Sequence, residues 1–517
     1  MSTVQKLAIG AVVLATAWGA TTLYIGAQAE KQFNATLDKI EQEFPALNIK
    51  ERKFEQSFFS SKGTVTLQPD LSGLLDEFGL KSAEETSLTL ETHIQHGPLT
   101  DQGFHLATFR IQPLYTPEQR AQQKALFGDQ EPFTAYGQWR FSGVLHGHYS
   151  LAPFAVPDAE HENEIKLGGL TIEFGAQEDK LLWLSGSLPS LSIHPFDASG
   201  AAAADALFEL GSLNLQTNNH YNGPVVGDVV PSEVSLLAEK LTLRGAGENP
   251  SLELGKLALQ GSLALQNDFA DIKETFTFGS ITFRDGNNAQ EYKELGSLTF
   301  QMDMEHLAAE PLDALLKALE NMNAVNLDDK QKLELFAANS APHLIELLTA
   351  NPVFSFDPIR LATPKGEISL RVRLAAPGLG QQDLINPVGA FDKLQVDITG
   401  AAPKAAVVYA SALLGQTSEE AAAKELEGWL ADAQKENLFS VEGDAIRFSF
   451  QVQQGTVTLN GQSSTFIELL QKSQSAQSLM EGDANEDPNE EDDTPIILPP
   501  ENRGTTGGAV PPQANVG

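Results

Sequence analysis

The chain has 517 residues, of which 41% are hydrophobic and 20% are charged, so most of it can fold, although it is too long for one compact core. Its 34 basic and 69 acidic residues give a net charge of −35, which repels nucleic acid and argues against nucleic-acid binding as the main role. The absence of cysteine excludes disulfides, thiol nucleophiles and cysteine-rich zinc sites, but it does not identify a compartment.

The first feature along the chain is an uncharged apolar segment, residues 7–25, which directly follows Lys6. A helix crosses the roughly 30 Å hydrocarbon core with about 20 apolar residues. The segment therefore predicts a transmembrane anchor behind a cytoplasmic stub, together residues 1–29, with the rest of the chain exported. Ala27 and Ala29 also fit a signal-peptide cleavage site before Glu30, which would export the body as well. A buried core helix is the third interpretation, and it alone leaves the body unexported.

Residues 30–300 are predicted to form one helix and then many strands. Apolar residues at helical spacing predict a helix from Glu30 to Phe44, and Pro45 ends it. After Ile49, short runs alternate between apolar and polar residues, often behind a glycine, as at residues 255–259 and 296–300. The irregular spacing of these runs excludes a solenoid, so we expect an antiparallel sheet with one buried face.

Residues 301–475 are predicted to mix helices with strands. Apolar stripes and caps predict helices at Leu312–Met322, at Asp328–Asn339, from Pro342 to just before Asn351, at Lys404–Leu414, at Ser418–Lys435 and at Thr465–Gln471. Alternation predicts strands at Val353–Ile359 and Glu367–Leu374, and a hairpin that pairs Ala445–Gln453 with Thr456–Leu459.

The expected fold class is α+β and mainly antiparallel β: an elongated strand-rich body with helical insertions, preceded by one transmembrane helix. We expect two sheet sub-cores with the helical region around residues 304–351 between them. Residues 476–517 are rich in acidic residues, proline and glycine and cannot bury enough apolar area to offset their ordering entropy. They predict a disordered tail, which is either simply solvated or a docking peptide.

The sequence contains no recognisable catalytic motif. The sequence contains no P-loop, no HExxH, no GxSxG and no dinucleotide-binding glycine motif before a helix. We therefore expect a protein that is not an enzyme and assign no catalytic, cofactor-binding or metal-binding residues. The turns at His96–Leu99 and at Asn222–Pro224 are the remaining places for a site, and the simpler interpretation of both is a turn.

Two patterns resemble metal sites. His146 and His148 share one face of a predicted strand, with His161 and Glu162 nearby in sequence, but an exposed strand face without a third ligand is the simpler interpretation. The spacing of aspartate and asparagine at 483, 485 and 487 imitates a calcium loop. There, proline stands at 488 where glycine is needed, and threonine stands at 494 where the bidentate glutamate belongs.

Five features follow one another in a recognisable order: the apolar segment at 7–25, Ser57–Ser61, His96–Leu99, Asn351–Ile359 and Gly455–Gly461. In this order the chain resembles the YdgA-like family of Gram-negative bacteria, a family of unknown function, from the anchor to about Gln471. The resemblance implies a single-pass inner-membrane protein with a periplasmic body, and it is compatible with a homodimer. It supplies no site residues and says nothing of the tail.

Three functions remain open. An envelope scaffold or interaction protein fits the anchor, the large strand-rich body and the missing motifs. A lipid- or amphiphile-binding module fits a long sheet with one apolar face that helices close imperfectly. An unrecognised hydrolase is the third. The expected partners are the inner membrane through residues 7–25, a lipid or an envelope protein, and a second copy of the chain.

Overall fold

The structure is a computed structural model. It describes residues 34, 37–38, 41, 47–57, 60–68, 87–96, 99–100, 103–158, 163–177, 180–196, 207–244, 251–284, 292–324, 329–385, 387–415 and 417–465. The expected transmembrane segment at 7–25 and the expected tail at 476–517 lie outside these residues. Among the residues described, no helix combines the length and the apolar composition that a membrane span requires.

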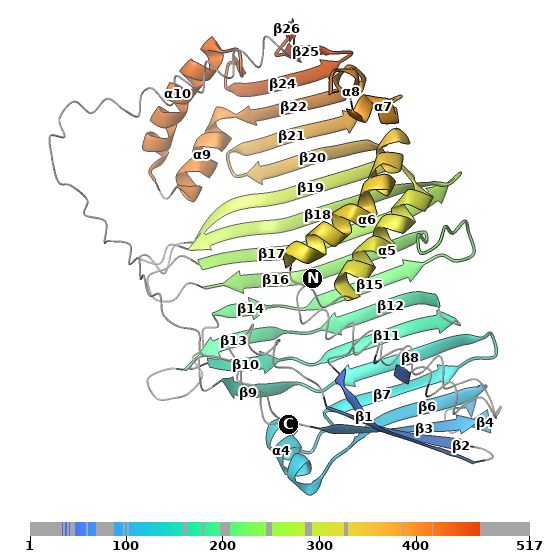
Figure 1. Cartoon of the computed structure of the whole chain (residues 1–517). Helices are drawn as coiled ribbons and strands as arrows, with labels where there is room; N and C mark the ends of the chain where they lie inside the picture. Colours follow the sequence, from blue (N-terminus) through green and yellow to red (C-terminus); the bar gives the residue numbers. More distant parts are fainter. Residues whose placement is uncertain are drawn as a thin grey trace, which may run out of the picture. The chain divides into compact units, whose positions relative to one another are not determined.

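Strands dominate the described residues, and neighbouring strands pair antiparallel, as the sequence predicted (Figure 1). The first region of the sheet comprises β1 (Ile49–Gln56), β2 (Ser60–Leu67), β3 (Leu88–His96), β6 (Ala107–Leu114), β7 (Phe133–Trp139), β8 (Val144–Leu151), β11 (Leu170–Gln177) and β12 (Lys180–Leu188). Helix α4 (Pro117–Phe127) connects β6 to β7, and the short pair β4 (Leu99–Thr100) and β5 (Gly103–Phe104) lies apart from the main sheet.

Interrupted strands form the next part of the sheet. These strands are β9 (Phe154–Asp158), β10 (Asn163–Leu167), β13 (Leu191–Pro195), β14 (Phe208–Leu210) and β15 (Leu213–Asn219). Only two residues separate β10 from β11, β12 from β13, and β14 from β15. At the first of these breaks a Cβ on Gly168 would lie 2.4 Å from the Ser190 hydroxyl oxygen, so close approach of the backbones requires glycine.

Longer strands form the second region. They are β16 (Ser232–Leu243), β17 (Ser251–Gln266), β18 (Phe269–Arg284), β19 (Tyr292–Ala308), β20 (Val353–Thr363), β21 (Gly366–Ala375), β22 (Gln395–Pro403) and β24 (Ala445–Gln453). The short strands of this region are β23 (Ser440–Glu442), β25 (Thr456–Leu459) and β26 (Gln462–Thr465). The helices of this region are α5 (Ala309–Ala324), α6 (Asp329–Thr349), α7 (Gln381–Ile385), α8 (Pro387–Lys393), α9 (Lys404–Leu414) and α10 (Glu419–Lys435).

One expectation about the sheet is wrong. The helical region does not separate two sub-cores, because the main strands belong to one continuous sheet. β19 pairs with β18 on one side and with β20 on the other, so that Phe300 is in register with both Phe276 and Ile359. Helices α5 and α6 are therefore an insertion between two strands that pair with each other, and residue 300 lies inside a strand.

Some of the helix predictions are confirmed, and one is wrong. Helix α9 begins and ends as predicted, and α10 begins one residue after the predicted start because Ser418 is its cap and accepts a hydrogen bond from the Ala421 amide. The predicted break at Pro342 is wrong, since α6 runs through it. Proline removes one amide donor, but Ser340 and Leu347 are buried on either side of it, and this packing holds the helix together. The helix predicted at Thr465–Gln471 lies outside the described residues except for Thr465, which ends β26.

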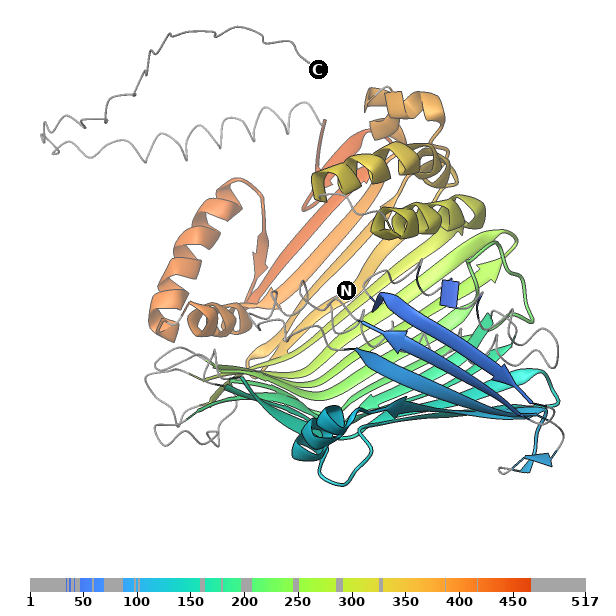
Figure 2. The same cartoon turned by 60° about the horizontal axis from the view of Figure 1, so that its bottom comes forward.

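The first region has a closed core. Figure 2 shows β1–β3 turned back over the strands that follow them, and buried side chains from β2, β3, β6, β8 and β11 form one apolar cluster. Leu37, one of the four described helical residues between 34 and 41, is buried in this cluster. Arg52 holds the same helix by ion pairs with Asp38 and, at 2.6 Å, with Glu41.

Two glycines make room for two aromatic rings in the closed core. Gly137 and Gly147 are directly opposite each other on β7 and β8. A Cβ on Gly137 would lie 2.3 Å from the Phe109 ring, and a Cβ on Gly147 would lie 2.1 Å from the Phe174 ring. The rings thus occupy the space that two side chains would fill, which explains how Phe109 and Phe174 become 2% and 0% exposed.

Candidate functional site

The second region presents an apolar face, and no second sheet of described strands packs against it. Two cross-strand rows run along it, and we call them together the central strip. The first row consists of Leu236, Leu259, Phe276, Phe300, Ile359, Leu370, Gly400 and Phe448, each in register with the next from β16 to β24. The second row consists of Val234, Gly261, Glu274, Met302, Phe356, Val372, Ile398 and Phe450.

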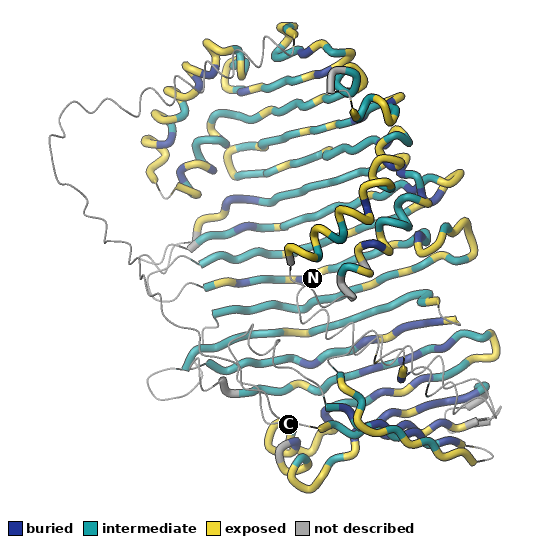
Figure 3. The backbone as a smooth tube through the Cα atoms, in the orientation of Figure 1, coloured by how far each residue is buried: buried dark blue, intermediate teal, exposed yellow. Residues whose placement is uncertain are grey.

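All residues of the central strip are partly exposed, and none is fully buried. Figure 3 shows the same intermediate burial along most of the length of β17–β22. Aromatic rings connect three of these strands, with ring centres 5.9 Å apart between Phe276 and Phe300 and 5.5 Å apart between Phe300 and Phe356. A contiguous apolar surface that remains partly exposed is a candidate binding surface.

The opposite face of the same strands is polar. On β19 the residues that alternate with the strip are Thr299, Gln301 and Asp303, and on β21 they are Ser369, Arg371 and Arg373. Successive residues of a strand point to opposite faces, so the sheet has one hydrated face and one apolar face. The apolar face therefore needs a cover, and the polar face does not.

Among the residues that the structure describes, helices pack against this face near the two ends of its strands (Figure 2). At one end, α5 and α6 place Leu312, Leu315 and Leu347 against a cluster that includes Leu263 and Met304. At the other end, α9 places Ala410 and Leu413 against a second cluster, and the Tyr409 hydroxyl donates a 2.6 Å hydrogen bond to the Glu294 carbonyl. No residue of the central strip belongs to either cluster.

A partly exposed ion pair fixes the α5 end of this cover. The Asp313 carboxylate on α5 accepts hydrogen bonds from the Asp228 amide and the Lys317 ammonium, both at 2.7 Å. Burial opposes ionisation of Asp313, but these hydrogen bonds outweigh it, and the pKa of Asp313 is lowered. The contact fastens the loop between β15 and β16 to α5 and places Val229, which is buried, in the cluster beneath the helices.

The predicted histidine pair lies on the outer face of the first region. The His148 ring stacks on Tyr136 and approaches the Glu173 carboxylate at 3.2 Å, while the His146 ring packs 5.3 Å from the Trp183 ring. Burial lowers the pKa of His146. Within the described ranges no three histidine, aspartate or glutamate side chains gather as metal ligands, and residues 161–162 lie outside those ranges.

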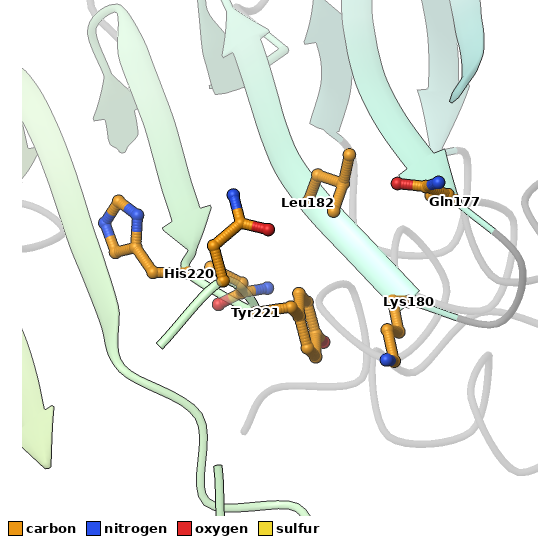
Figure 4. A pocket seen from close by; sticks show the side chains of 7 residues that line it. Gln177, Lys180, Leu182, His220 and Tyr221 are labelled. Carbon is orange, nitrogen blue, oxygen red and sulfur yellow. The ribbon is translucent and has the colours of Figure 1, made fainter. Parts of the chain in front are cut away.

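A small polar cavity lies where β11, β12 and β15 end (Figure 4). The cavity has a volume of about 350 Å³. In its lining, the Lys180 ammonium lies 5.3 Å from the centre of the Tyr221 ring. Asn222, from one of the two predicted turns, lines this cavity. The lining side chains are three amides, one imidazole (His220), one ammonium, one phenol and one leucine. At the other predicted turn, His96 ends β3 and Leu99 begins β4, while residues 97–98 lie outside the described residues. The calcium-like residues at 483–494 lie wholly outside them.

A shallower depression of about 510 Å³ lies on the polar face of the second region. Three arginines line it, and each contacts a carboxylate through Nε: Arg360 with Glu367 at 3.2 Å, Arg371 with Asp357 at 3.0 Å, and Arg447 with Glu442 at 3.5 Å. These are ordinary cross-strand pairs of a hydrated face, each with little effect on stability.

A polar cluster around one carboxylate lies on the outer face of the first region. Glu91 on β3 is buried, and it contacts Lys62, His93 and, at 3.4 Å, the Gln112 side-chain amide. Burial alone would raise the pKa of Glu91, but the hydrogen bonds from Lys62 and His93 lower it below its ordinary value. The cluster lies away from any described cavity, so its role is to join β2, β3 and β6.

The described residues define a class of protein: one continuous antiparallel sheet that closes over its own apolar face in the first region and packs helices against the ends of its strands in the second. The chain belongs to the bacterial family described as "Bacterial protein of unknown function (DUF945)", whose sequence model matches residues 4–466. This confirms the resemblance to a family of unknown function that the ordered motifs suggested. No curated protein matches the chain.

Proposed function

We propose that the protein binds the acyl chain of a lipid or a similar amphiphile along the central strip. The observation that carries the proposal is the continuity of the strip, which crosses from β16 to β24 while remaining partly exposed throughout. Apolar surface favours burial, and each methylene group that leaves water contributes about 0.8 kcal/mol.

The dimensions of the strip suit an acyl chain. Eight strands cross it, and at about 4.8 Å per strand the seven spacings give a row of roughly 34 Å. An acyl chain spans half of the roughly 30 Å hydrocarbon core of a bilayer, about 15 Å, so the row exceeds the length of one chain. The aromatic rings at Phe276, Phe300 and Phe356 provide flat contact area along the way.

The proposal includes a location. An anchor at residues 7–25 in the inner membrane, with the body in the periplasm, would place the strip beside a source of lipid, and this rests on the apolar composition of the segment. An envelope protein or a second copy of the chain could bury the same surface in place of a lipid. The experiment must therefore distinguish these occupants from a lipid.

The test is a binding measurement on the full chain held in a nonionic amphipathic polymer, with a fluorescent fatty acid that brightens in apolar surroundings. Phe300→Asp places a carboxylate in the middle of the strip and should weaken probe affinity at least tenfold. The matched control is Thr299→Asp, one residue away on the polar face, and it should bind like the wild type. Phe300→Thr, which preserves strand propensity, should give an intermediate loss.

Two outcomes would contradict the proposal. One is equal probe affinity for the wild type, Phe300→Asp and Thr299→Asp when the thermal unfolding midpoints agree. The other is a change of oligomeric state in Phe300→Asp without a change in probe binding, because this would assign the strip to contact between copies of the chain.

A further inference from the structure

One charged side chain stands on the apolar face within the central strip. Glu274 is in register with Gly261 on β17 and with Met302 on β19, and it shares its face of β18 with Ile272 and Phe276. Every other described position of the two rows is apolar or glycine. Glu274 therefore breaks an otherwise apolar surface at one defined point.

Glu274 has no partner among the described residues, since no ion pair or hydrogen bond involves its carboxylate there. The contrast with Arg52 is informative, because that charge, in register with Val65 of the closed core, has two carboxylate partners from one helix. Protein charges that lie on apolar surfaces are normally paired in this way. The lack of a partner at Glu274 indicates that the partner comes from outside the described residues.

Glu274 lies among apolar neighbours on this face. Gly261 opposite it has no side chain, and the place that a Cβ on Gly261 would take lies 2.8 Å from the Val234 Cγ1 and 3.8 Å from the Glu274 Cγ. Ile272, near the start of β18, packs against the cluster under α5 and α6, and Glu274 lies two residues further along the strand on the same face. It thus marks the edge of the helix cover, where the central strip begins.

Covering the strip with an acyl chain would take water away from this carboxylate. A dehydrated carboxylate is strongly unfavourable unless a cation accompanies it. The net charge of −35 attracts cations to the whole chain and repels anionic headgroups. A ligand that carries a positive charge next to its acyl chain supplies the cation that the carboxylate needs and is attracted by the net negative charge.

We propose that Glu274 selects amphiphiles with a cationic amine, whose ammonium group pairs with the carboxylate while the chain lies along the row of Phe276 and Phe300. This inference rests on the proposed function, because it assigns the polar group of the same ligand. The hydrogen bonds of the ammonium replace the water that the chain displaces.

The experiment compares three probes of equal chain length, hexadecylamine, hexadecanol and hexadecanoate, bound to the full chain in a nonionic amphipathic polymer at pH 7. The wild type should bind the amine at least tenfold more tightly than the alcohol. Glu274→Gln should reduce amine affinity to that of the alcohol and leave the alcohol unchanged. Glu274→Lys should reverse the preference towards hexadecanoate.

The control is Glu305→Gln, which removes a carboxylate from the polar face of β19 and should leave all three affinities unchanged. Equal amine affinity in the wild type, Glu274→Gln and Glu274→Lys would overturn the inference. The proposed function would survive that result if Phe300→Asp still weakened all three probes. If Phe300→Asp left all three unchanged, the proposed function would fail, and the inference would fail with it.

Discussion

The two regions of the sheet share one alternating pattern but differ in how their apolar faces are covered. In the first region Phe174 is fully buried, with 0% of its surface exposed, whereas Phe300 in the second region is partly exposed although it occupies an equivalent inward position. The first region covers its own face by turning β1–β3 back over it, and a helix pinned by Arg52 adds to the cover. In the second region, the described cover consists of helices at the ends of the strands.

This difference teaches that alternation determines which face is apolar but does not determine what covers it. Closing a face requires a second layer of matching size, and in the second region the described helices are too few to provide it. The closed region should therefore respond to mutation as a core does, and the open region should respond as a binding surface does.

The largest expected effect is a difference between two phenylalanine truncations. Phe174→Ala removes a fully buried ring and should lower the free energy of unfolding by about 3–5 kcal/mol. Phe300→Ala removes a ring that is already partly hydrated and should cost less than half as much. Chemical denaturation of the two variants measures the difference, and equal losses would contradict the distinction between a closed and an open region.

Glycine substitutions should show the same contrast at smaller magnitude. A Cβ on Gly147 would clash with the Phe174 ring, so Gly147→Ala should cost about 1–3 kcal/mol. A Cβ on Gly400, in the open region, would have the Leu370 side chain at 3.6 Å as an ordinary contact. Gly400→Ala should therefore be neutral or stabilise by up to about 1 kcal/mol. Thermal unfolding of both variants provides the measurement, and a destabilised Gly400→Ala would argue that the strip is already packed.

The third contrast concerns a paired and an unpaired carboxylate. Glu91→Gln removes a paired charge and should cost about 1–2 kcal/mol at pH 7, whereas Glu274→Gln should cost nothing measurable. Because the folded-state pKa of Glu91 is lowered, its contribution is present above the ordinary value of 4.5 and is lost as the pH falls through the folded-state pKa. The unfolding curves of wild type and Glu91→Gln should thus converge in acid. A difference that persists at low pH would assign the loss to packing.

Local features were predictable from the sequence, and non-local ones were not. The end residues of α9, the cap at Ser418 and the hairpin of β24 and β25 all depend on neighbouring residues, so period and capping rules located them. The pairing of Phe300 with Ile359 crosses the inserted helices α5 and α6, and no local pattern records that partner. The prediction of two sub-cores failed for this reason.

The apolar character of the central strip could be predicted from the sequence, but its exposure could not. Alternation in β17 and β19 predicted an apolar face, but whether helices cover that face depends on where α5, α6 and α9 pack. Glu274 did leave a signal, since it interrupts the apolar positions of Ile272, Phe276 and Phe278 with a charge. Its register opposite Gly261 became visible only in the structure.

Photo-crosslinking in living cells tests the central claim most directly, because it needs no detergent and no purified ligand. A benzophenone side chain is incorporated in the full chain at position 300, on the apolar face, or at position 299, on the polar face. The account predicts a lipid-sized mass adduct after illumination at position 300 and none at position 299. A polypeptide adduct at position 300, or equal lipid labelling at both positions, would contradict it.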